Sequence, residues 1–320
     1  MENQKLKLSF VIPCYGSEKT IKGVIEEIKE SLEKLKVYQY EIILINDCSN
    51  DNTYDVIKEL AFEDEKIVGI NLTKNYGQHA ALMTGFRRVT GDVIICLDDD
   101  GQTPADEVGK LLQKIYDGYD VVYACYEQKQ HSKFRNFGSQ INDWMTTYLL
   151  GKPRKLKVTS YFAAKRYIVD EIVRYKNPYP YVIGLILRTT KNITNVKVNH
   201  RERVEGTSGY SIKKLVALWV NGFTAFSVKP LRIATLAGVI CAFIGFIFLL
   251  YIIINRIFNP LVPLGWSSVM AMILFIGGML MLMLGIIGEY IGRIYICINN
   301  SPQYVIKEVI KKKKEENIVE

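Results

Sequence analysis

The sequence predicts an α/β domain with a mostly parallel sheet, followed by a hairpin of two membrane-spanning helices. In the first half of the chain, short apolar runs of strand length alternate with stretches of helix length. This alternation is typical of a parallel sheet covered by helices. In the last third, apolar residues gather after Arg232. A chain of 320 residues has room for one substantial domain and a smaller part.

Five apolar, β-rich runs are expected to form buried strands: 8–12, 41–46, 67–72, 92–97 and 121–124. Four helix-like stretches lie between them: 18–35, 52–63, 78–89 and 105–117. Sheets of this kind bind ligands in a crevice at the carboxyl ends of their strands. We therefore expect the functional residues directly after Ile12, Asn46 and Leu97.

Two segments, Ile233–Ile254 and Trp266–Ile287, are each 22 residues long without a charged side chain. At about 1.5 Å per residue each is roughly 33 Å long, which is enough to cross a bilayer core. Two consecutive segments of this kind disfavour the alternative, a pair of buried core helices. The connection carries only Arg256, whereas basic residues follow the second segment at Arg293, Lys307 and Lys311–Lys314. The positive-inside rule then predicts a multi-pass protein of the inner or plasma membrane with both termini in the cytoplasm.

The chain is expected to divide into a cytoplasmic domain at 1–209, interfacial amphipathic helices at 210–231, the hairpin at 232–288 and a basic cytoplasmic tail at 289–320. The second part mixes lysines with aromatic residues, which suits the headgroup region, and an amphipathic core helix is the alternative. The net charge of +8 suits anionic lipids or phosphate-bearing substrates. Because no recognition motif accompanies the basic residues, nucleic acid is not an expected partner.

Three carboxylates, Asp98, Asp99 and Asp100, follow one predicted strand directly. Their mutual repulsion would be costly without a cation. Mg²⁺ and Mn²⁺ favour carboxylate oxygens and commonly bridge a protein to a diphosphate. A solvated acidic turn is the alternative, and the position at a strand end favours the metal.

Polar residues also follow the two other strands. Tyr15 and Glu18 come after the first, where an aromatic ring and a carboxylate could contact a base, and Asp47 comes after the second. Three polar loops at adjacent strand ends predict a shared pocket.

Four segments in this order resemble the inverting glycosyltransferases of family two: VIPCYGSEKTI, INDCSNDNT, NYGQHAALMTG and LDDDGQTP. With the hairpin, the chain is similar to the polyprenyl-phosphate branch, which includes dolichyl-phosphate mannose synthases and bactoprenol glucosyltransferases. The resemblance implies a nucleotide-diphospho-sugar transferase fold with a Rossmann-like sheet. It also implies transfer of one sugar from a nucleotide-diphosphate sugar to undecaprenyl phosphate or a related polyprenyl phosphate. By similarity to bacterial members the donor is a UDP-sugar, and a GDP-sugar is the alternative. Relatives with two spans can assemble into tetramers, so the resemblance makes a homotetramer one candidate assembly, and the oligomeric state stays open.

The resemblance assigns roles to individual residues. It implies that the nucleoside is cradled by Pro13, Tyr15, Glu18 and Asp47. It places Mg²⁺ or Mn²⁺ and the diphosphate at Asp98, Asp100 and Gln102, with Asp99 among the donor-binding residues. Arg135 and Ser139 match positions near the acceptor phosphate, and Arg201 and Arg203 match positions near the donor diphosphate or the acceptor. The residues expected to be catalytic are Asp98, Asp100, Arg135 and Arg201.

The sequence departs from the family pattern at several positions. Asn46 replaces the first aspartate of a common pair, and the family's acidic-Phe-Arg segment reads Ser160-Tyr161-Phe162-Ala163, without the arginine. Other cations are therefore candidates for phosphate recognition: Lys165, Arg166, Lys213 and Lys214.

Two other functions fit parts of the sequence. A polysaccharide-elongating transferase would usually carry a Gln-x-x-Arg-Trp motif, and no tryptophan here follows an arginine. A non-catalytic nucleotide-sugar sensor would not need the intact set of Asp98, Asp100 and Gln102.

Transfer to a lipid phosphate needs no strong general base, because the attacking oxygen is already anionic. The identity of the sugar stays open.

Overall fold

The computed structural model describes residues 6–126, 147, 151–199, 229–258, 265–299 and 301–312. The chain forms two compact units. The first comprises Met1–Tyr210 with Asn300–Glu320, and the second comprises Ser211–Asn299.

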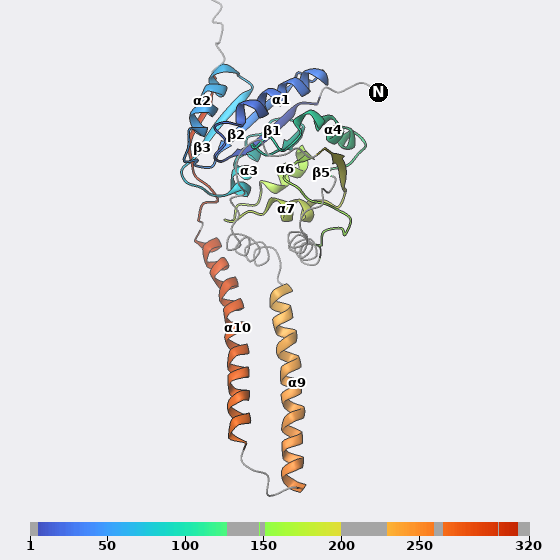
Figure 1. Ribbon diagram of the computed structural model, residues 1–320, viewed down its shortest axis with the longest axis vertical. Coiled ribbons are helices and arrows are strands. Elements are labelled where there is room, and N and C mark those ends of the chain that lie inside the picture. The colour runs from blue at the N-terminus through green and yellow to red at the C-terminus, as the bar shows by residue number, and fades with distance from the viewer. Residues whose placement is uncertain are drawn as a thin grey trace, which may run out of the picture. The chain divides into compact units, whose positions relative to one another are not determined.

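An eight-stranded sheet forms the centre of the first unit among the described residues, with the order β7-β5-β6-β4-β1-β2-β3-β8 (Figure 1). The strands are β1 (Leu8–Cys14), β2 (Tyr40–Asn46), β3 (Ile67–Leu72), β4 (Val93–Cys96), β5 (Val121–Tyr126), β6 (Phe162–Lys165), β7 (Ile193–Val198) and β8 (Ile306–Lys311). β1 pairs in parallel with both β2 and β4, whereas β6 and β8 are antiparallel to their neighbours. The predicted mostly parallel α/β sheet is therefore confirmed.

Helices cover both faces of this sheet (Figure 1). They are α1 (Ile21–Lys34), α2 (Thr53–Glu63), α3 (Gln78–Phe86), η1 (Ala105–Glu107), α4 (Val108–Tyr116), α6 (Arg166–Ile172) and α7 (Val182–Thr189). Because side chains alternate along a strand, Phe10 and Ile12 of β1 join the main apolar core with α1, α2 and α4. Val11 points to the opposite face, where α3 lies so close that a Cβ on Gly85 would stand 2.4 Å from the Val11 Cγ1 atom.

The apolar face of α1 shows why this segment forms a helix. Its buried residues include Ile21, Val24, Ile25, Ile28 and Leu32, at the spacing of three and four residues that places side chains on one helix face. Each fully buried isoleucine or leucine stabilises the fold by roughly 1.5–3 kcal/mol. This packing fixes the position of the loop between β1 and α1 at the carboxyl end of β1.

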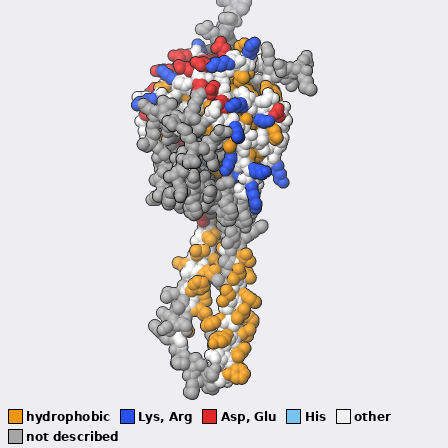
Figure 2. All heavy atoms as spheres, turned by 45° about the vertical axis from the view of Figure 1, so that its right-hand side comes forward, with side chains coloured by type: hydrophobic (Ala, Val, Ile, Leu, Met, Phe, Trp, Pro, Cys, Tyr) orange, Lys and Arg blue, Asp and Glu red, His pale blue; other side chains and the backbone are white. Residues whose placement is uncertain are grey.

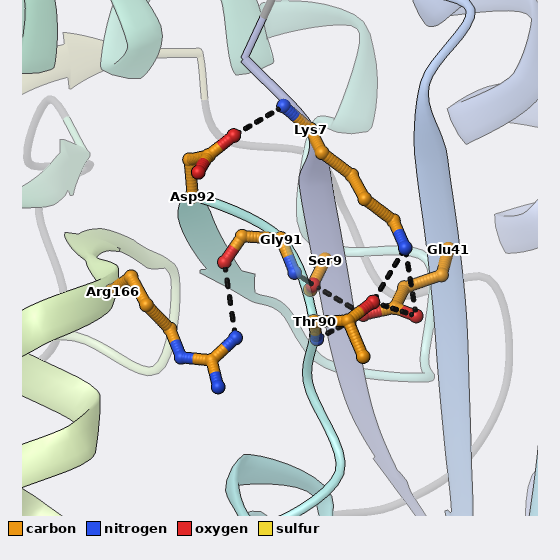
Figure 3. Close-up of polar contacts among 7 residues, drawn as sticks. All are labelled: Lys7, Ser9, Glu41, Thr90, Gly91, Asp92 and Arg166. Carbon is orange, nitrogen blue, oxygen red and sulfur yellow. Dashed lines mark hydrogen bonds and ion pairs between the residues drawn. The ribbon is translucent and has the colours of Figure 1, made fainter.

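A polar cluster lies where β1, β2 and β4 begin (Figure 3). Glu41 accepts hydrogen bonds from the Ser9 hydroxyl at 2.6 Å and from the Thr90 backbone N–H and hydroxyl at 2.5 and 2.8 Å. The Lys7 Nζ atom lies 3.6 Å from the Glu41 carboxylate. These contacts join the amino ends of β1, β2 and β4, at the edge of the sheet opposite the carboxyl ends of the parallel strands.

The second unit contains two long helices, α9 (Lys229–Phe258) and α10 (Trp266–Ile298). The predicted spans lie inside them. Gly238 of α9 approaches Met283 of α10 closely, since a Cβ on this glycine would lie 2.8 Å from the Met283 Cε atom. Figure 2 shows hydrophobic side chains along these helices. Within the described residues, Phe275–Ile298 is long and apolar enough to cross a membrane, and a shorter apolar stretch covers Ala234–Phe248.

The chain after α10 returns to the sheet of the first unit. β8, which lies in the region predicted as a basic tail, pairs with β3 and buries Ile310 in the core. The Tyr54 hydroxyl donates to Glu308 at 2.9 Å, and Lys312 donates to the Glu63 carbonyl at 3.3 Å. The interfacial helices predicted at 210–231 lie outside the described residues, apart from the start of α9.

Candidate functional site

The candidate site lies at the point where the strand order of the sheet reverses. From β1 the chain continues to β2 and β3 on one side and then crosses to β4 on the other. The loops after β1 and β4 therefore flank a topological switch point, which is where open α/β sheets bind ligands. These two loops are joined directly: the Tyr15 N–H donates to Asp99 Oδ2 at 2.9 Å, and the Thr20 hydroxyl donates to the Asp99 carbonyl at 2.6 Å.

The acidic loop after β4 is held by neutral donors. Gln78 Nε2 donates to Asp98 Oδ1 at 3.0 Å, and the Ser160 hydroxyl donates to Asp98 Oδ2. The Gln102 N–H donates to Asp100 Oδ1 at 3.0 Å. Burial raises the pKa of Asp99 to about 6, and the neighbouring charge of Asp98 adds to this shift. Three consecutive carboxylates thus lie together in a half-buried loop, and a cation would relieve their repulsion.

Asp47, after β2, fixes the entry to α3. Its Oδ1 atom accepts the N–H of Tyr76 and its Oδ2 atom accepts the N–H of Gly77, each at 2.7 Å. Burial raises the pKa of Asp47, although the two N–H donors act in the opposite direction. The carboxylate predicted to contact a nucleoside therefore also holds the loop 73–77 against the end of β2.

The departure from the family pattern at Asn46 has a structural reason. The Asn46 amide donates to Asn71 Oδ1 at 2.9 Å, which an aspartate at this position could not do when ionised. Its Oδ1 atom accepts the Ser49 hydroxyl at 2.6 Å, and Ser49 Oγ in turn accepts the Gly16 N–H at 3.2 Å. Asn46 thereby links β3 to the loop after β1.

The predicted nucleoside-contacting residues of the first loop differ in their surroundings. Tyr15 leaves 54 % of its surface exposed, whereas Pro13 lies within β1. Glu18 accepts the Asn52 N–H at 3.0 Å, so it is tied to the start of α2. Of these side chains, the Tyr15 ring is the most accessible for stacking.

Several sequence-predicted residues lie outside the described part of the chain. They are Arg135, Ser139, Arg201, Arg203, Lys213 and Lys214. Lys165 and Arg166 are described, and their candidate role at the phosphates is wrong. Because β6 runs antiparallel to β4, Lys165 pairs with Val93 at the edge opposite the acidic loop. There Lys165 contacts Asp120, and Arg166 contacts Asp170. Arg166 also donates to the Gly91 carbonyl (Figure 3).

Sequence reasoning missed three polar residues of this site. Gln78 and Ser160 contact Asp98, and Tyr126 lies close enough to Asp98 and Asp100 for their charges to act on it. Burial is the main reason that the pKa of Tyr126 rises to about 12. Two signals were present: Gln78 directly follows Gly77 in the family-like segment NYGQHAALMTG, and Ser160 begins the altered family segment.

Comparisons with known proteins agree with this geometry. The family model "Glycosyl transferase family 2" matches residues 9–173, and the model "GtrB C-terminal hairpin" matches residues 229–294. The second match covers most of α9 and α10, so the C-terminal two-helix hairpin is confirmed, whereas the crossing of the membrane by both helices stays a prediction.

Curated relatives are similar over nearly their whole length. An undecaprenyl-phosphate 4-deoxy-4-formamido-L-arabinose transferase of Yersinia enterocolitica is 34 % identical over 99 % of this chain and 98 % of its own. A protein of the same name from Proteus mirabilis is 33 % identical over 96 % of this chain and 95 % of its own.

Solved structures share the fold at lower identity. Glucosyl-3-phosphoglycerate synthase from Mycobacterium tuberculosis, in complex with Mn²⁺, UDP and phosphoglyceric acid, has a TM-score of 0.51 at 19 % identity, covering 67 % of this chain and 74 % of that one. The same enzyme with Mn²⁺ and UDP-glucose has a TM-score of 0.50 at 18 % identity, covering 67 % and 75 %. The switch-point site, the family match over half of the chain and the full-length relatives together show that this chain belongs to glycosyl transferase family 2, carries a GtrB-type C-terminal hairpin and is a glycosyltransferase.

Proposed function

We propose that this enzyme transfers one sugar from a nucleotide-diphosphate sugar, a UDP-sugar, to undecaprenyl phosphate or a related polyprenyl phosphate, with metal assistance and inversion at the anomeric carbon. The observation that carries the proposal is the 34 % identity over 99 % of the chain to an enzyme named for an undecaprenyl-phosphate acceptor. The hairpin match supports it, because a polyprenyl acceptor lies in the membrane.

The donor is proposed to bind across the loops after β1, β2 and β4. The exposed Tyr15 ring suits stacking with a base. Tyr15 and Thr20 donate hydrogen bonds to Asp99. These bonds fix the position of the loop proposed to contact the nucleoside relative to the acidic loop proposed to contact the diphosphate. The neighbours of similar fold that contain UDP and UDP-glucose support a uridine nucleotide.

The residues of the acidic loop fit Mg²⁺ or Mn²⁺. Asp98, Asp100 and Gln102 offer oxygen ligands, which these cations prefer. The donor diphosphate would supply further oxygen ligands, since these cations commonly bridge a protein to a diphosphate. When bound, the cation would neutralise charge on the departing nucleotide diphosphate.

The acceptor phosphate is proposed to meet the donor through arginines, which bind phosphate by paired hydrogen bonds. Arg135 and Ser139 are proposed for the acceptor, and Arg201 and Arg203 for the donor diphosphate or the acceptor. An oxygen of the lipid phosphate attacks the anomeric carbon as the bond to the nucleotide diphosphate breaks. Since the attacking oxygen is anionic, alignment and charge stabilisation are the main tasks of the protein.

The membrane arrangement is proposed from chain connectivity. β8 follows α10 and belongs to the same sheet as β1, which supports placing the chain before and after the hairpin on one side of the membrane. The basic residues after the second span favour the cytoplasm for that side. Cytoplasmic nucleotide sugars would then reach the donor site.

The experiment uses the full-length protein in detergent with a short-chain polyprenyl phosphate and a panel of nucleotide sugars, with mass spectrometry of the lipid product. One UDP-sugar should give a lipid-phosphate sugar, and excess chelator should stop its formation.

Asp100→Asn should lose most activity. Asp117→Asn should not, because Asp117 is an exposed carboxylate paired with Lys114 at the end of α4. Arg135→Lys should impair turnover because lysine lacks the planar fork of arginine. Absence of any glycolipid product across the panel would contradict the acceptor assignment, and full activity in chelator would contradict the metal.

A further inference from the structure

The carboxylate of Asp98 is bound on both oxygens by side chains from two segments that are far apart in the sequence. Gln78, the first residue of α3, donates its Nε2 hydrogen to Oδ1 at 3.0 Å. Ser160, two residues before β6, donates its hydroxyl to Oδ2. Rotation of the carboxylate about its Cβ–Cγ bond would break both hydrogen bonds, so the two donors fix its plane.

Both donors stand on anchored backbone. Gln78 directly follows Gly77, whose N–H is held by Asp47 at 2.7 Å. On one side of Ser160, the Thr159 hydroxyl donates to the Ala124 carbonyl at 2.9 Å. On the other side, the buried Tyr161 donates its hydroxyl to the Pro104 carbonyl at 3.2 Å. The position of Asp98 is therefore set by α3 and by the segment before β6, in addition to its own loop.

The chemistry of the two donors suits a metal-binding carboxylate. An amide and a hydroxyl are neutral, so they orient the carboxylate and leave its negative charge available to a cation. Side chains that orient the ligands of a metal in this way tune its affinity.

We propose that Gln78 and Ser160 are positioning residues that hold Asp98 in the orientation needed to bind a divalent cation together with a nucleoside diphosphate. This inference rests on the proposed function in one respect, the assignment of Asp98 to the metal. It adds two residues from outside the acidic loop, and it links cation affinity to the position of α3.

The test measures binding of Mn²⁺ by electron paramagnetic resonance on the full-length protein in detergent, with UDP present. The variants are Gln78→Ala and Ser160→Ala. Loss of one orienting donor should weaken Mn²⁺ binding by about 10- to 100-fold. Ser160→Thr keeps the hydroxyl and should stay within about threefold of wild type, since hydrogen bonding to Asp98 is retained. The matched control is Gln113→Ala, which removes a similar hydrogen bond of 3.1 Å to Asp117 on the exposed side of α4 and should change nothing.

Kinetics and unfolding separate positioning from general damage. For Gln78→Ala and Ser160→Ala, the KM for Mn²⁺ should rise, and much of kcat should return at saturating Mn²⁺. The thermal unfolding midpoint in chelator should stay close to that of wild type, because Gln78 is exposed and Ser160 is half-buried.

Each outcome distinguishes this inference from the function on which it rests. If wild type and Ser160→Ala bind Mn²⁺ equally and Asp98→Asn binds none, the metal assignment stands and the role of Ser160 is overturned; the same comparison applies to Gln78→Ala. If Ser160→Ala loses Mn²⁺ binding, Ser160→Thr loses it as well and the unfolding midpoint falls, the positioning role of Ser160 is also overturned. If wild type binds no Mn²⁺ with UDP, the metal assignment and this inference both fall.

Discussion

Asp47 accepts a hydrogen bond of 2.7 Å from the N–H of Gly77, which joins the end of β2 to the start of α3. The other carboxylate oxygen accepts the N–H of Tyr76 at the same distance. Backbone N–H groups at the start of a helix have no partner within the helix. A carboxylate at this point accepts hydrogen bonds from them, and its negative charge interacts favourably with the helix dipole. The shape of the loop 73–77, beside the proposed donor site, thus depends on one buried charge.

Asp47→Asn should weaken UDP binding by about tenfold, because an amide has one acceptor oxygen and would turn an NH₂ group toward a second N–H donor. Isothermal titration calorimetry with UDP and Mn²⁺ measures the change. The control is Asp55→Asn on α2, an exposed carboxylate 3.8 Å from Lys58, which should leave binding unchanged. Equal UDP affinity of wild type and Asp47→Asn would contradict the role given to this loop.

Gly77→Ala should destabilise the protein through backbone strain alone. Gly77 has φ +87° and ψ 158°, a region that is nearly restricted to glycine and costs other residues on the order of 1–3 kcal/mol. A Cβ at this position would meet no atom within 4 Å, so steric contact adds nothing. Gly23→Ala in the first turn of α1 is the opposite case: space is also free there, and alanine should stabilise the helix by up to about 0.5–1 kcal/mol. The unfolding midpoints in detergent should shift in opposite directions, and shifts of the same sign would refute this account.

Glu41 should make stability depend on pH in the acidic range. Burial by itself would raise the pKa of Glu41, but hydrogen bonds from Ser9 and Thr90 and the charge of Lys7 outweigh burial and lower it (Figure 3). A lowered folded-state pKa contributes stability above the ordinary glutamate pKa of about 4.3, and this contribution is lost as the pH falls through the folded-state value. Glu41→Gln should therefore cost about 1–3 kcal/mol at pH 7 and progressively less below pH ~4.

Unfolding midpoints of wild type and Glu41→Gln between pH 3 and 8 measure this dependence. Glu59→Gln is the matched control, because its 2.9 Å ion pair with Lys22 is exposed on both sides. Exposed pairs contribute about 0–1 kcal/mol, so this variant should follow wild type across the range. A constant difference between wild type and Glu41→Gln at every pH would show that the charge of Glu41 is not the cause.

The segment after α10 should stabilise α3 and the loop before it. Tyr304 accepts a hydrogen bond of 2.7 Å from Arg87 at the C-terminal end of α3, and its ring lies 5.1 Å from the guanidinium carbon. The next residue, Val305, accepts the N–H of Thr73 at 3.0 Å. Tyr304→Phe should cost about 0.5–1.5 kcal/mol by removing the hydrogen bond, and Tyr304→Ala should cost more by removing the ring as well.

Hydrogen exchange followed by mass spectrometry should show faster exchange in peptides that cover Thr73 and β8 in Tyr304→Ala. Tyr179→Phe, at an exposed ring, serves as the control and should leave both peptides unchanged. If exchange rises evenly over the whole first unit, Tyr304 contributes to global stability and has no particular effect on this loop.

The parts of the fold that were predictable are those with a local signal. The first five strands follow runs of β-branched and aliphatic residues, and the structure confirms all of them with ends shifted by up to two residues. β6 reads Phe-Ala-Ala-Lys, too short and too poor in β-branched residues to be recognised. β8 reads Ile-Lys-Glu-Val-Ile-Lys, which lacks the strict alternation of a half-buried strand and adjoins a run of lysines, and its partner β3 lies more than 230 residues earlier. Such long-range pairing leaves no trace in the local pattern.

The candidate site shows the same division. Carboxylates that follow a strand directly indicate a ligand-binding edge, so Asp47 and Asp98 could be found from the sequence. Their partners could not, because Gln78 and Ser160 reach Asp98 only through the packing of α3 and β6 around the end of β4. The same limit explains the error at Lys165: without the antiparallel direction of β6, nothing in the sequence shows that this lysine lies at the opposite edge.

The position of β8 in the sheet gives a prediction about membrane topology. Since β8 and β1 share one sheet, residues on each must face the same compartment, and only the connection between α9 and α10 should face the other. Single cysteines at Pro263, Lys307 and Tyr179 test this in intact cells with a membrane-impermeant maleimide. The background lacks the native cysteines at positions 14, 48, 96, 125, 241 and 297.

Pro263→Cys should be labelled in intact cells. Lys307→Cys in β8 and Tyr179→Cys, both at exposed side chains of the first unit, should be labelled only after permeabilisation. Labelling of Lys307→Cys but not Tyr179→Cys in intact cells would mean an odd number of crossings, which cannot be reconciled with the pairing of β8 and β3. Labelling of both, with Pro263→Cys protected, would keep the hairpin and reverse its orientation, in conflict with the basic residues that follow the second span.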